Sequence, residues 1–223
     1  MARPVKKQPE QWKQEILDAA KTLFLTKGYE ATSVQDMMEL AGGAKGMFYR
    51  FFESKEAVMQ ALGDRMFLEN NPFEAVRGRK DLTGLEKIRE MLKLDQEDEI
   101  RERIQTQAVP ILEDPRILAA AVAANRRVLT PLWRELIEEG RRDGSIRTEY
   151  ARELSELLPL VNFWLMPSVF PGSREEILHR CRFVAQVLTA MGLPIIREEM
   201  YGRVEKILEG NSSDTELLRH TAI

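Results

Sequence analysis

The sequence predicts an all-α protein in which a small N-terminal helix-turn-helix domain precedes a larger C-terminal helical domain. Apolar residues recur at spacings of three and four along most of the 223 residues, and no stretch alternates as a half-buried strand would. The stretch 32–55 contains two short helical patterns separated by Ala41-Gly42-Gly43, and the second has a basic and aromatic outer face. Two such helices across a tight turn are typical of a DNA-reading helix-turn-helix.

A first helix is expected over residues 10–27, ended by Gly28 because glycine readily adopts the conformation that closes a helix. Its predicted buried stripe consists of Ile16, Ala19, Ala20, Leu23 and Phe24. The basic residues before it, Arg3, Lys6 and Lys7, could lie along phosphates or form a solvated tail, and both interpretations remain open.

The second helix is expected to begin at Thr32, whose hydroxyl can form a capping box with Gln35. The third should begin near Ala44 or Lys45. Phe48 and Phe52 are four residues apart and should therefore face inward. This spacing leaves the side chains of the remaining positions towards solvent, namely Lys45, Met47, Tyr49 and Arg50.

A fourth helix follows, with Ser54 as its cap and Lys55 in its first turn, where free N–H groups favour a phosphate. Its apolar pattern, Val58, Met59, Leu62 and Met66, continues to Asn70-Asn71-Pro72. This helix should begin beside the DNA and end inside the second domain.

The run from Gly28 to Ala57, GYEATSVQDMMELAGGAKGMFYRFFESKEA, resembles the N-terminal domain of tetracycline-repressor-type (TetR) regulators. The family pattern is a glycine-aromatic pair, Thr-Ser, then Ala-Gly-Val-Ser-Lys-Gly-Thr-Leu-Tyr-x-His-Phe and Ser-Lys-Glu. The matching residues are Gly28-Tyr29, Thr32-Ser33, Ala41, Gly42, Lys45, Gly46, Tyr49, Phe52 and Ser54-Lys55-Glu56. Four positions depart, with Gly43 for valine, Ala44 for serine, Met47 for threonine and Phe51 for histidine.

The resemblance implies a DNA-binding surface at these positions: Thr32, Ser33, Ala44, Lys45, Gly46, Met47, Tyr49, Arg50 and Lys55. Lys45, Tyr49 and Lys55 match family residues that touch the DNA backbone or base edges. Arg50 can pair with guanine, whereas Met47 can offer only apolar contact, for example with a thymine methyl group. Phe51 cannot make the polar contact of the histidine that it replaces.

The rest of the chain is expected to be helical after a charge-rich linker or loop over Pro72–Asp81. One helix should begin at the capping box Thr83–Glu86, and another should hold Ile100 and Ile104 before an interruption at Pro110. The acidic run Asp95–Glu99 is interpreted as a solvated loop between them. Asp114-Pro115 should open a long helix closed by Gly140 and Gly144, with a possible kink at Pro131.

Two strong helical patterns follow, over residues 148–166 and residues 173–191, the second opened by the capping box Ser173–Glu176. The resemblance implies that this pair packs against the same pair of a second subunit, which gives a homodimer. Ordinary intrachain core is the alternative for any single residue of the pair. A further helix is expected near residues 196–208, and the predicted domains are residues 1–55, 56–209 and a polar tail, 210–223.

The resemblance implies that the protein is a repressor of a palindromic double-stranded DNA operator. A small apolar effector that binds the second domain should release it from that DNA. Met66, Trp133, Asn162 and Trp164 could line its pocket or belong to plain core. A domain that senses a protein partner and a regulator that activates transcription both remain alternatives.

Composition excludes several other classes of protein. The net charge is −3, and residues 1–55 carry nine Lys/Arg against seven Asp/Glu, so basic character is weak and local. The lone Cys181 and the lack of a signal peptide or membrane-spanning run favour a cytoplasmic protein. His179 and Cys181 are too few to hold a metal, no cofactor motif is evident, and no polar cluster suggests an enzyme. Gly42–Gly46 resembles a phosphate-binding loop but follows a helix and lacks the Lys-Ser/Thr ending.

Overall fold

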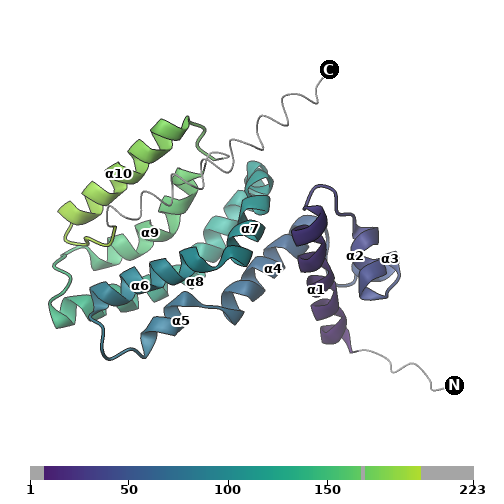
Figure 1. The fold of residues 1–223 in the computed structure, drawn as a ribbon, viewed down its shortest axis with the longest axis horizontal. Helices are drawn as coiled ribbons and strands as arrows, with labels where there is room; N and C mark the ends of the chain where they lie inside the picture. Colours follow the sequence, from purple (N-terminus) through teal and green to yellow (C-terminus); the bar gives the residue numbers. More distant parts are fainter. Residues whose placement is uncertain (1–7, 167–168, 197–223) are drawn as a thin grey trace. The chain divides into compact units, whose positions relative to one another are not determined.

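The computed structural model describes residues 8–166 and 169–196, and every regular element within these ranges is helical (Figure 1). The elements are α1 (Pro9–Lys27), α2 (Val34–Ala41), α3 (Lys45–Phe48), α4 (Lys55–Glu69), α5 (Pro72–Arg77), α6 (Gly84–Glu97), α7 (Glu99–Ala108), a 3-10 turn (Val109–Glu113), α8 (Pro115–Asp143), α9 (Ala151–Leu165) and α10 (Arg174–Ala190). None of the described helices has the length and apolar character needed to cross a membrane. The predicted basic arm and the predicted segments 196–208 and 210–223 lie outside the described residues, apart from Ile196.

The chain divides into two compact units. One runs to Asn71 and includes Asp95–Ile111, and the other comprises Pro72–Leu94 and the chain from Leu112 onward. The predicted domain boundary at residue 55 differs from this division. The reason is that α4 and α7 bury side chains in the same core as the first three helices, so they belong with those helices.

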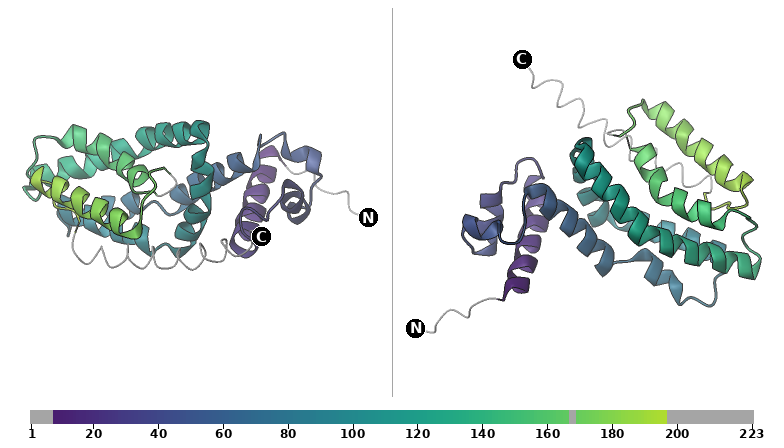
Figure 2. Two further views of the ribbon diagram at one scale, coloured as in Figure 1. Left: turned by 90° about the horizontal axis from the view of Figure 1, so that it is seen from above. Right: turned by 180° about the vertical axis from the view of Figure 1, so that it is seen from behind.

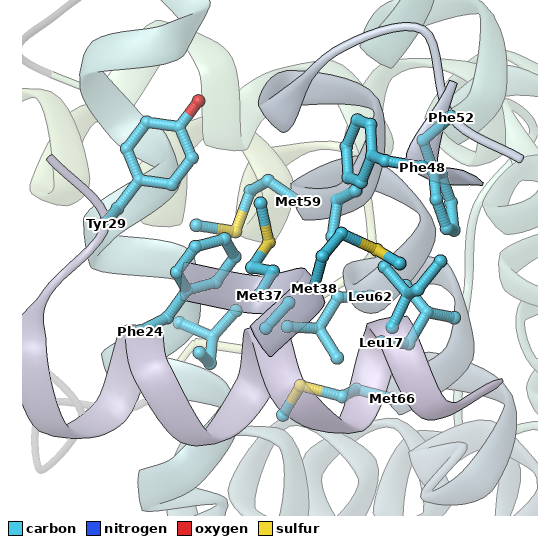
Figure 3. Packing of buried hydrophobic residues seen from close by; sticks show 14 residues of the cluster. Leu17, Phe24, Tyr29, Met37, Met38, Phe48, Phe52, Met59, Leu62 and Met66 are labelled. Atoms are coloured by element: carbon cyan, nitrogen blue, oxygen red, sulfur yellow. The ribbon is translucent and has the colours of Figure 1, made fainter. Parts of the chain in front are cut away.

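The core of the first unit is a cluster of aliphatic, aromatic and methionine side chains (Figure 3). α1 contributes Ile16, Leu17, Ala20 and Phe24, and α4 contributes Val58, Met59, Leu62 and Met66, as their spacing predicts apart from Leu17. Each large side chain buried in this way stabilises the fold by roughly 1.5–3 kcal/mol.

Helix α7 is fastened to the end of α1 by polar side chains. Gln107 Nε2 donates to the carbonyl oxygen of Phe24 (2.9 Å), and Gln107 Oε1 accepts from the backbone N–H of Tyr29 (2.7 Å). Arg103 donates to the carbonyl oxygen of Leu25 (2.8 Å). The last carbonyls of a helix lack intrahelical partners, so α7 supplies donors that α1 needs.

The prediction of a loop over residues 95–99 is wrong. α6 continues to Glu97, and Asp98 accepts from the backbone N–H of Arg101 (3.0 Å) at the start of α7. The acidic side chains are held there by Arg101, which is buried and pairs with Asp95 (2.7 Å) and Asp98 (3.5 Å). Arg101 also donates to the carbonyl oxygen of Asn70 at the end of α4.

The prediction of a linker or loop over residues 72–81 is wrong for Pro72–Arg77, which forms α5, and is confirmed for residues 78–81. Its inward side chains, Pro72, Phe73 and Val76, follow helical spacing, and Phe73 meets Trp133 edge to face with ring centroids 5.4 Å apart. Arg77 pairs with Glu135 of α8 (2.8 Å) and also with Glu74 of its own helix. Glu74 and Arg77 therefore lie on the solvated face of α5, and the other charges of the stretch, such as the Arg79–Asp81 pair, lie in the turn after it.

Helices α6 and α8 cross with their backbones in close contact. A Cβ atom on Gly84 would lie 2.2 Å from the backbone nitrogen of Gly140, so glycine is required at this crossing. Lys87, which is buried, pairs with Glu139 beside it (2.6 Å). The expectation that Gly140 closes α8 is thus wrong, and Gly144, with φ of 81°, closes the helix.

Helix α9 packs alongside α8, and α10 packs on α9 (Figures 1 and 2). The capping boxes at Thr83–Glu86 and Ser173–Glu176 are confirmed. The α10 residues Ile177, Cys181, Val184 and Leu188 are intrachain core. Leu157 and Leu160 of α9 and Phe183 of α10 remain exposed.

Candidate nucleic-acid interface

The turn between α2 and α3 is a glycine-stabilised helix ending. Gly42 adopts the left-handed conformation, with φ of 75° and ψ of 29°. Its N–H donates to the carbonyl oxygen of Glu39 (3.1 Å), and the N–H of Gly43 donates to that of Met38 (2.9 Å). This pair of bonds is the Schellman motif, and it redirects the chain so that α3 begins at Lys45.

The residues that begin α2 differ from the prediction. Ser33, rather than Thr32, is the N-cap, and its capping box is formed with Asp36 rather than Gln35. Thr32 is buried, and its hydroxyl donates to the carbonyl oxygen of Gly28 (2.6 Å). The Ser33 hydroxyl donates to the Asp36 carboxylate (2.8 Å). The hydroxyls of Thr32 and Ser33, both predicted to contact DNA, therefore have partners within the chain.

A salt bridge supports this cap. Lys27 Nζ lies 2.8 Å from Asp36 Oδ2. The hydrogen bond from Lys27, followed by those from the backbone and hydroxyl of Ser33, lowers the pKa of Asp36 to about 2. The Asp36 carboxylate thus occupies the anion-binding end of α2, which leaves less room there for a phosphate.

The outward side chains at and after α3 form the candidate reading ridge, which we define as Ala44–Gly46 with Tyr49 and Arg50. All five are exposed, and Tyr49 keeps 58% of its surface accessible while Phe48 keeps 0% and Phe52 6%. Figure 3 shows Phe48 and Phe52 among the residues of the core cluster. The helix itself is only four residues long, and the chain continues through turns to Phe52, whose N–H donates to the Phe48 carbonyl oxygen (3.0 Å).

Packing explains the departures from the family pattern at positions 47 and 51. Met47 and Phe51 are partly buried against the core cluster of the first unit. Met47 was expected to point towards solvent, but its side chain is half-buried and also covers core. Phe51 supplies apolar contact within the protein where a histidine would carry polar nitrogens.

Lys55 has partners inside the protein. Its Nζ donates to the carbonyl oxygens of Tyr29 (2.9 Å) and Glu30 (3.5 Å) and lies 4.0 Å from the centroid of the Tyr29 ring. The Tyr29 hydroxyl donates to Glu56 (3.0 Å), and burial followed by this hydrogen bond raises the pKa of Tyr29. Lys55 thus fixes the loop before α2, which sequence spacing did not indicate.

Lys45 and Arg50 differ from Lys55, whose ammonium group donates to the Tyr29 carbonyl oxygen, because the side chain of neither makes a hydrogen bond or an ion pair within the described part of the chain. Their charges are therefore available to an anion in solvent. Tyr49 lies between Lys45 and Arg50 in the sequence and adds an exposed ring with a hydroxyl group. Its ring packs edge to face on Phe48, with the centroids 5.4 Å apart. A cation can bind a phosphate, and a guanidinium can also pair with a guanine edge.

The four predicted pocket residues are divided between the two units. Met66 is part of the core of the first unit, and Trp133 packs on Phe73 in the second. Asn162 is exposed, contrary to an enclosed position, and Trp164 meets Phe183 edge to face at 5.8 Å. Among the described residues, no group of three or more His, Cys, Asp or Glu side chains could hold a metal ion.

Trp12 and Gln107 were not predicted to matter for this surface. Trp12 lies four residues before Ile16, so it extends the buried stripe of α1, and its ring lies next to Gly43. That spacing could have placed Trp12. No sequence signal identifies Gln107, because its partners are backbone atoms of a distant helix end.

Comparisons with known proteins agree on one family. The family described as "Bacterial regulatory proteins, tetR family" matches residues 16–62. The HTH-type transcriptional repressor KstR2 of Rhodococcus jostii is 30% identical over 161 residues, which cover 63% of this chain and 71% of the relative. The HTH-type transcriptional regulator TtgR of Pseudomonas putida is 33% identical over 66 residues, 30% of this chain and 31% of its own.

Solved structures share the fold. Thermus thermophilus FadR, a TetR-family transcriptional repressor in complex with lauroyl-CoA, superposes with a TM-score of 0.58 at 24% identity, covering 83% of this chain and 96% of its own. NemR of E. coli superposes with a TM-score of 0.53 at 16% identity, covering 79% and 97%. The α2–turn–α3 geometry and these matches lead to one conclusion: the chain belongs to the TetR family and is a DNA-binding transcriptional regulator.

Proposed function

We propose that this regulator binds a palindromic operator as a homodimer, represses transcription there, and is released by a small apolar effector. The observation that carries the proposal is the reading ridge, which exposes Lys45, Tyr49 and Arg50 while Phe48 and Phe52 anchor the same segment in the core. Rigid support beneath an exposed cationic and aromatic surface is what groove recognition requires.

Each ridge residue has a proposed role that follows from its chemistry. Lys45 binds a phosphate, and Arg50 pairs with a guanine edge in the major groove. Tyr49 adds a hydroxyl contact, while Ala44 and Gly46 allow the backbone to approach the DNA closely. Met47 adds apolar contact through the part of its side chain that stays exposed. Thr32, Ser33 and Lys55 hold the ridge in place through their intrachain bonds.

Dimerisation supplies the second reading ridge. One helix-turn-helix covers few base pairs, whereas a two-fold dimer reads two half-sites about one helical turn apart. Support comes from the exposed apolar side chains of α9 and α10, Leu157, Leu160 and Phe183, which lie on the two helices predicted for this contact. Burying them against a second copy would remove them from water.

Effector binding is proposed for the second unit. The first half of α8, residues 115–131, carries no buried side chain, although it includes the partly buried apolar residues Leu118, Val122 and Leu129. An apolar ligand that covers such positions and prefers the released state would lower DNA affinity. A coupling of about 1–3 kcal/mol corresponds to roughly 5- to 150-fold weaker binding.

DNA binding is tested by titrating labelled DNA from upstream of the protein's own gene at several salt concentrations. Lys45→Ala should weaken binding and reduce the slope of log K against log salt by about one unit. Lys80→Ala, which removes an exposed lysine from the second unit, is the matched control and should change neither quantity. Equal slopes for wild type and Lys45→Ala would exclude the phosphate contact.

The effector proposal is tested by repeating the titration with lauroyl-CoA, the ligand held by Thermus thermophilus FadR, and with simple fatty acids. Release of DNA at concentrations that also raise the melting temperature of the free protein would support small-molecule control. If no apolar compound changes DNA affinity, the second unit is better assigned to a protein partner. A reporter gene behind the same DNA separates repression from activation.

A further inference from the structure

We propose that Trp12 of α1 is a positioning residue for the reading ridge, because its indole ring occupies the place of the side chain that Gly43 lacks. The inference rests on the proposed function, since it assigns Trp12 to DNA reading through the α2–α3 turn. It concerns a residue of α1 that is distant from the ridge in sequence and that no motif marks.

The turn between α2 and α3 lacks one contact that such turns commonly make. In a Schellman motif, the residue whose N–H closes the outer bond commonly makes an apolar contact with the residue that accepts it. Here the donor is Gly43 and the acceptor is the carbonyl oxygen of Met38 (2.9 Å). Gly43 has no side chain, so this turn cannot make that contact from its own sequence.

Trp12 and Met38 fill the space beside Gly43. A Cβ atom built on Gly43 would lie 2.6 Å from Met38 Cε and 2.9 Å from Trp12 Cζ3, both shorter than real Cβ contacts. The Trp12 ring and the Met38 side chain therefore already cover this position. Met38 is 1% exposed, so its methyl group has little freedom to move away.

Packing, rather than backbone conformation, makes glycine necessary at position 43. The glycines with positive φ are Gly28, Gly42, Gly144 and Gly192 among the described residues, and Gly43 is not one of them. An L residue could adopt the Gly43 backbone, and only the Trp12 ring and Met38 exclude it. Gly43 and Trp12 are thus a matched pair: the Trp12 ring fits because position 43 is a glycine and not the valine of the family pattern.

The contact between Trp12 and Gly43 bears on DNA reading because α3 starts directly after this turn. α3 is a single turn, its N-cap Ala44 offers no side-chain bond, and its start follows directly from Gly43. So short a helix has little stability of its own and takes its orientation from what it packs on. Phe48 fixes its inner side, and Trp12 fixes the turn from which it departs.

The test is a double-substitution cycle with four proteins: wild type, Trp12→Ala, Gly43→Val and Trp12→Ala/Gly43→Val. Gly63→Val is the matched control, because a Cβ on Gly63 meets nothing within 4 Å. For each protein, affinity is measured for the protein's upstream DNA and for a scrambled duplex of the same length, with the active fraction fixed by stoichiometric titration.

Each single substitution should lower the ratio of specific to non-specific affinity by about 5-fold or more, which corresponds to disturbing one base contact. The salt slope should stay unchanged, because no phosphate contact is removed. The double variant should return to within about 2-fold of wild type, since loss of the indole opens space into which the Met38 methyl group can move, and the valine fills part of that space. A residue that only stabilised the fold would change the active fraction and leave the ratio constant.

A DNA-independent measurement accompanies the cycle. Hydrogen exchange at the amides of Gly43 and Met47, which donate to Met38 (2.9 Å) and Ala44 (2.8 Å), should quicken in Trp12→Ala and recover in the double variant. Additive effects in the cycle, or exchange unaffected by Trp12→Ala, would overturn the positioning role. Failure of wild type to prefer its upstream DNA would instead count against the proposed function, while the exchange measurement still decides the role of Trp12.

Discussion

Two glycines of the first unit differ in the space around them, and this difference predicts opposite effects of the same substitution. Gly63→Ala should raise the melting temperature, because α4 gains about 0.5–1 kcal/mol from the lower backbone entropy of alanine and nothing lies within 4 Å of the new methyl group. Gly43→Ala should lower it, because the methyl group meets Met38 and Trp12. Thermal unfolding of both variants checks the prediction, and a rise for both would show that the turn relaxes freely.

Lys55 is expected to matter for folding as well as for binding. Lys55→Ala removes the bond to the Tyr29 carbonyl and the contact with the Tyr29 ring, which together should cost about 1–2 kcal/mol. Lys45→Ala, at an exposed site without such partners, should leave stability within about 0.5 kcal/mol of wild type. Chemical denaturation of the two variants measures the difference, and equal stabilities would contradict the structural role of Lys55.

Single-residue predictions succeeded where helical spacing decides the outcome. Phe48 and Phe52 are buried and Tyr49 is exposed, as their spacing predicts. The choice between Thr32 and Ser33 as the cap could not be made in this way. Both hydroxyls are suitable, and the carbonyl oxygen of Gly28, which accepts from Thr32, is placed by the loop between α1 and α2.

At the scale of elements, Gln107 holds α7 to the end of α1. Gln107→Leu should destabilise the protein by about 1–3 kcal/mol, because the Phe24 carbonyl and the Tyr29 N–H both lose their partner. Gln105→Leu, at an exposed position of the same helix, is the matched control and should have little effect. Urea unfolding monitored by circular dichroism compares the two variants, and equal midpoints would show that the Gln107 hydrogen bonds do not stabilise the fold.

The start of α2 should depend on pH through Asp36. The pKa of Asp36 is lowered in the folded protein from 3.8 to about 2, so its contribution is complete above pH 3.8 and is lost as pH falls towards 2. Wild type should therefore be more stable than Asp36→Asn at neutral pH, and this difference should shrink below pH 3.8. Melting temperatures across this range test the sign, and a difference that grew on acidification would contradict the assigned salt bridge.

The elements predicted correctly have strong local signals. Capping boxes marked Thr83–Glu86 and Ser173–Glu176, and apolar periodicity marked α1, α4 and α8. α5 and the end of α6 were missed because their charge was attributed to loops. Arg77 pairs with the distant Glu135, and Arg101 joins Asp95 to the Asn70 carbonyl oxygen at the end of α4; such contacts become visible only after folding.

At the scale of the whole molecule, the proposed dimer contact can be tested by placing a charge in it. Leu160→Glu should convert a dimer to a monomer and weaken operator binding, because an unpaired carboxylate would be buried in the contact. Leu68→Glu is the matched control, since Leu68 is an exposed leucine of α4 in the first unit. Light scattering after size exclusion measures the mass, and a wild-type monomer would refute the proposed assembly.

The helical class and the family could be predicted from the sequence, because the motif between Gly28 and Ala57 is long and ordered. The division into units could not, since α7 joins the first unit through Gln107 and Ile104 despite its distance in the chain. Sequence alone also does not separate pocket residues from core residues. Tryptophan and methionine serve both core and ligand sites, and Trp133 packs on Phe73 while Met66 packs in the other unit.

The most direct test of the reading ridge is hydroxyl-radical footprinting of the upstream DNA with wild type and Arg50→Ala at matched occupancy. Two protected patches should appear, centred about 10 base pairs or a multiple of this apart, and Arg50→Ala should lose discrimination at guanines within them. Protection spread evenly along the duplex, or an identical footprint and sequence preference for Arg50→Ala, would contradict the assignment of DNA reading to this ridge.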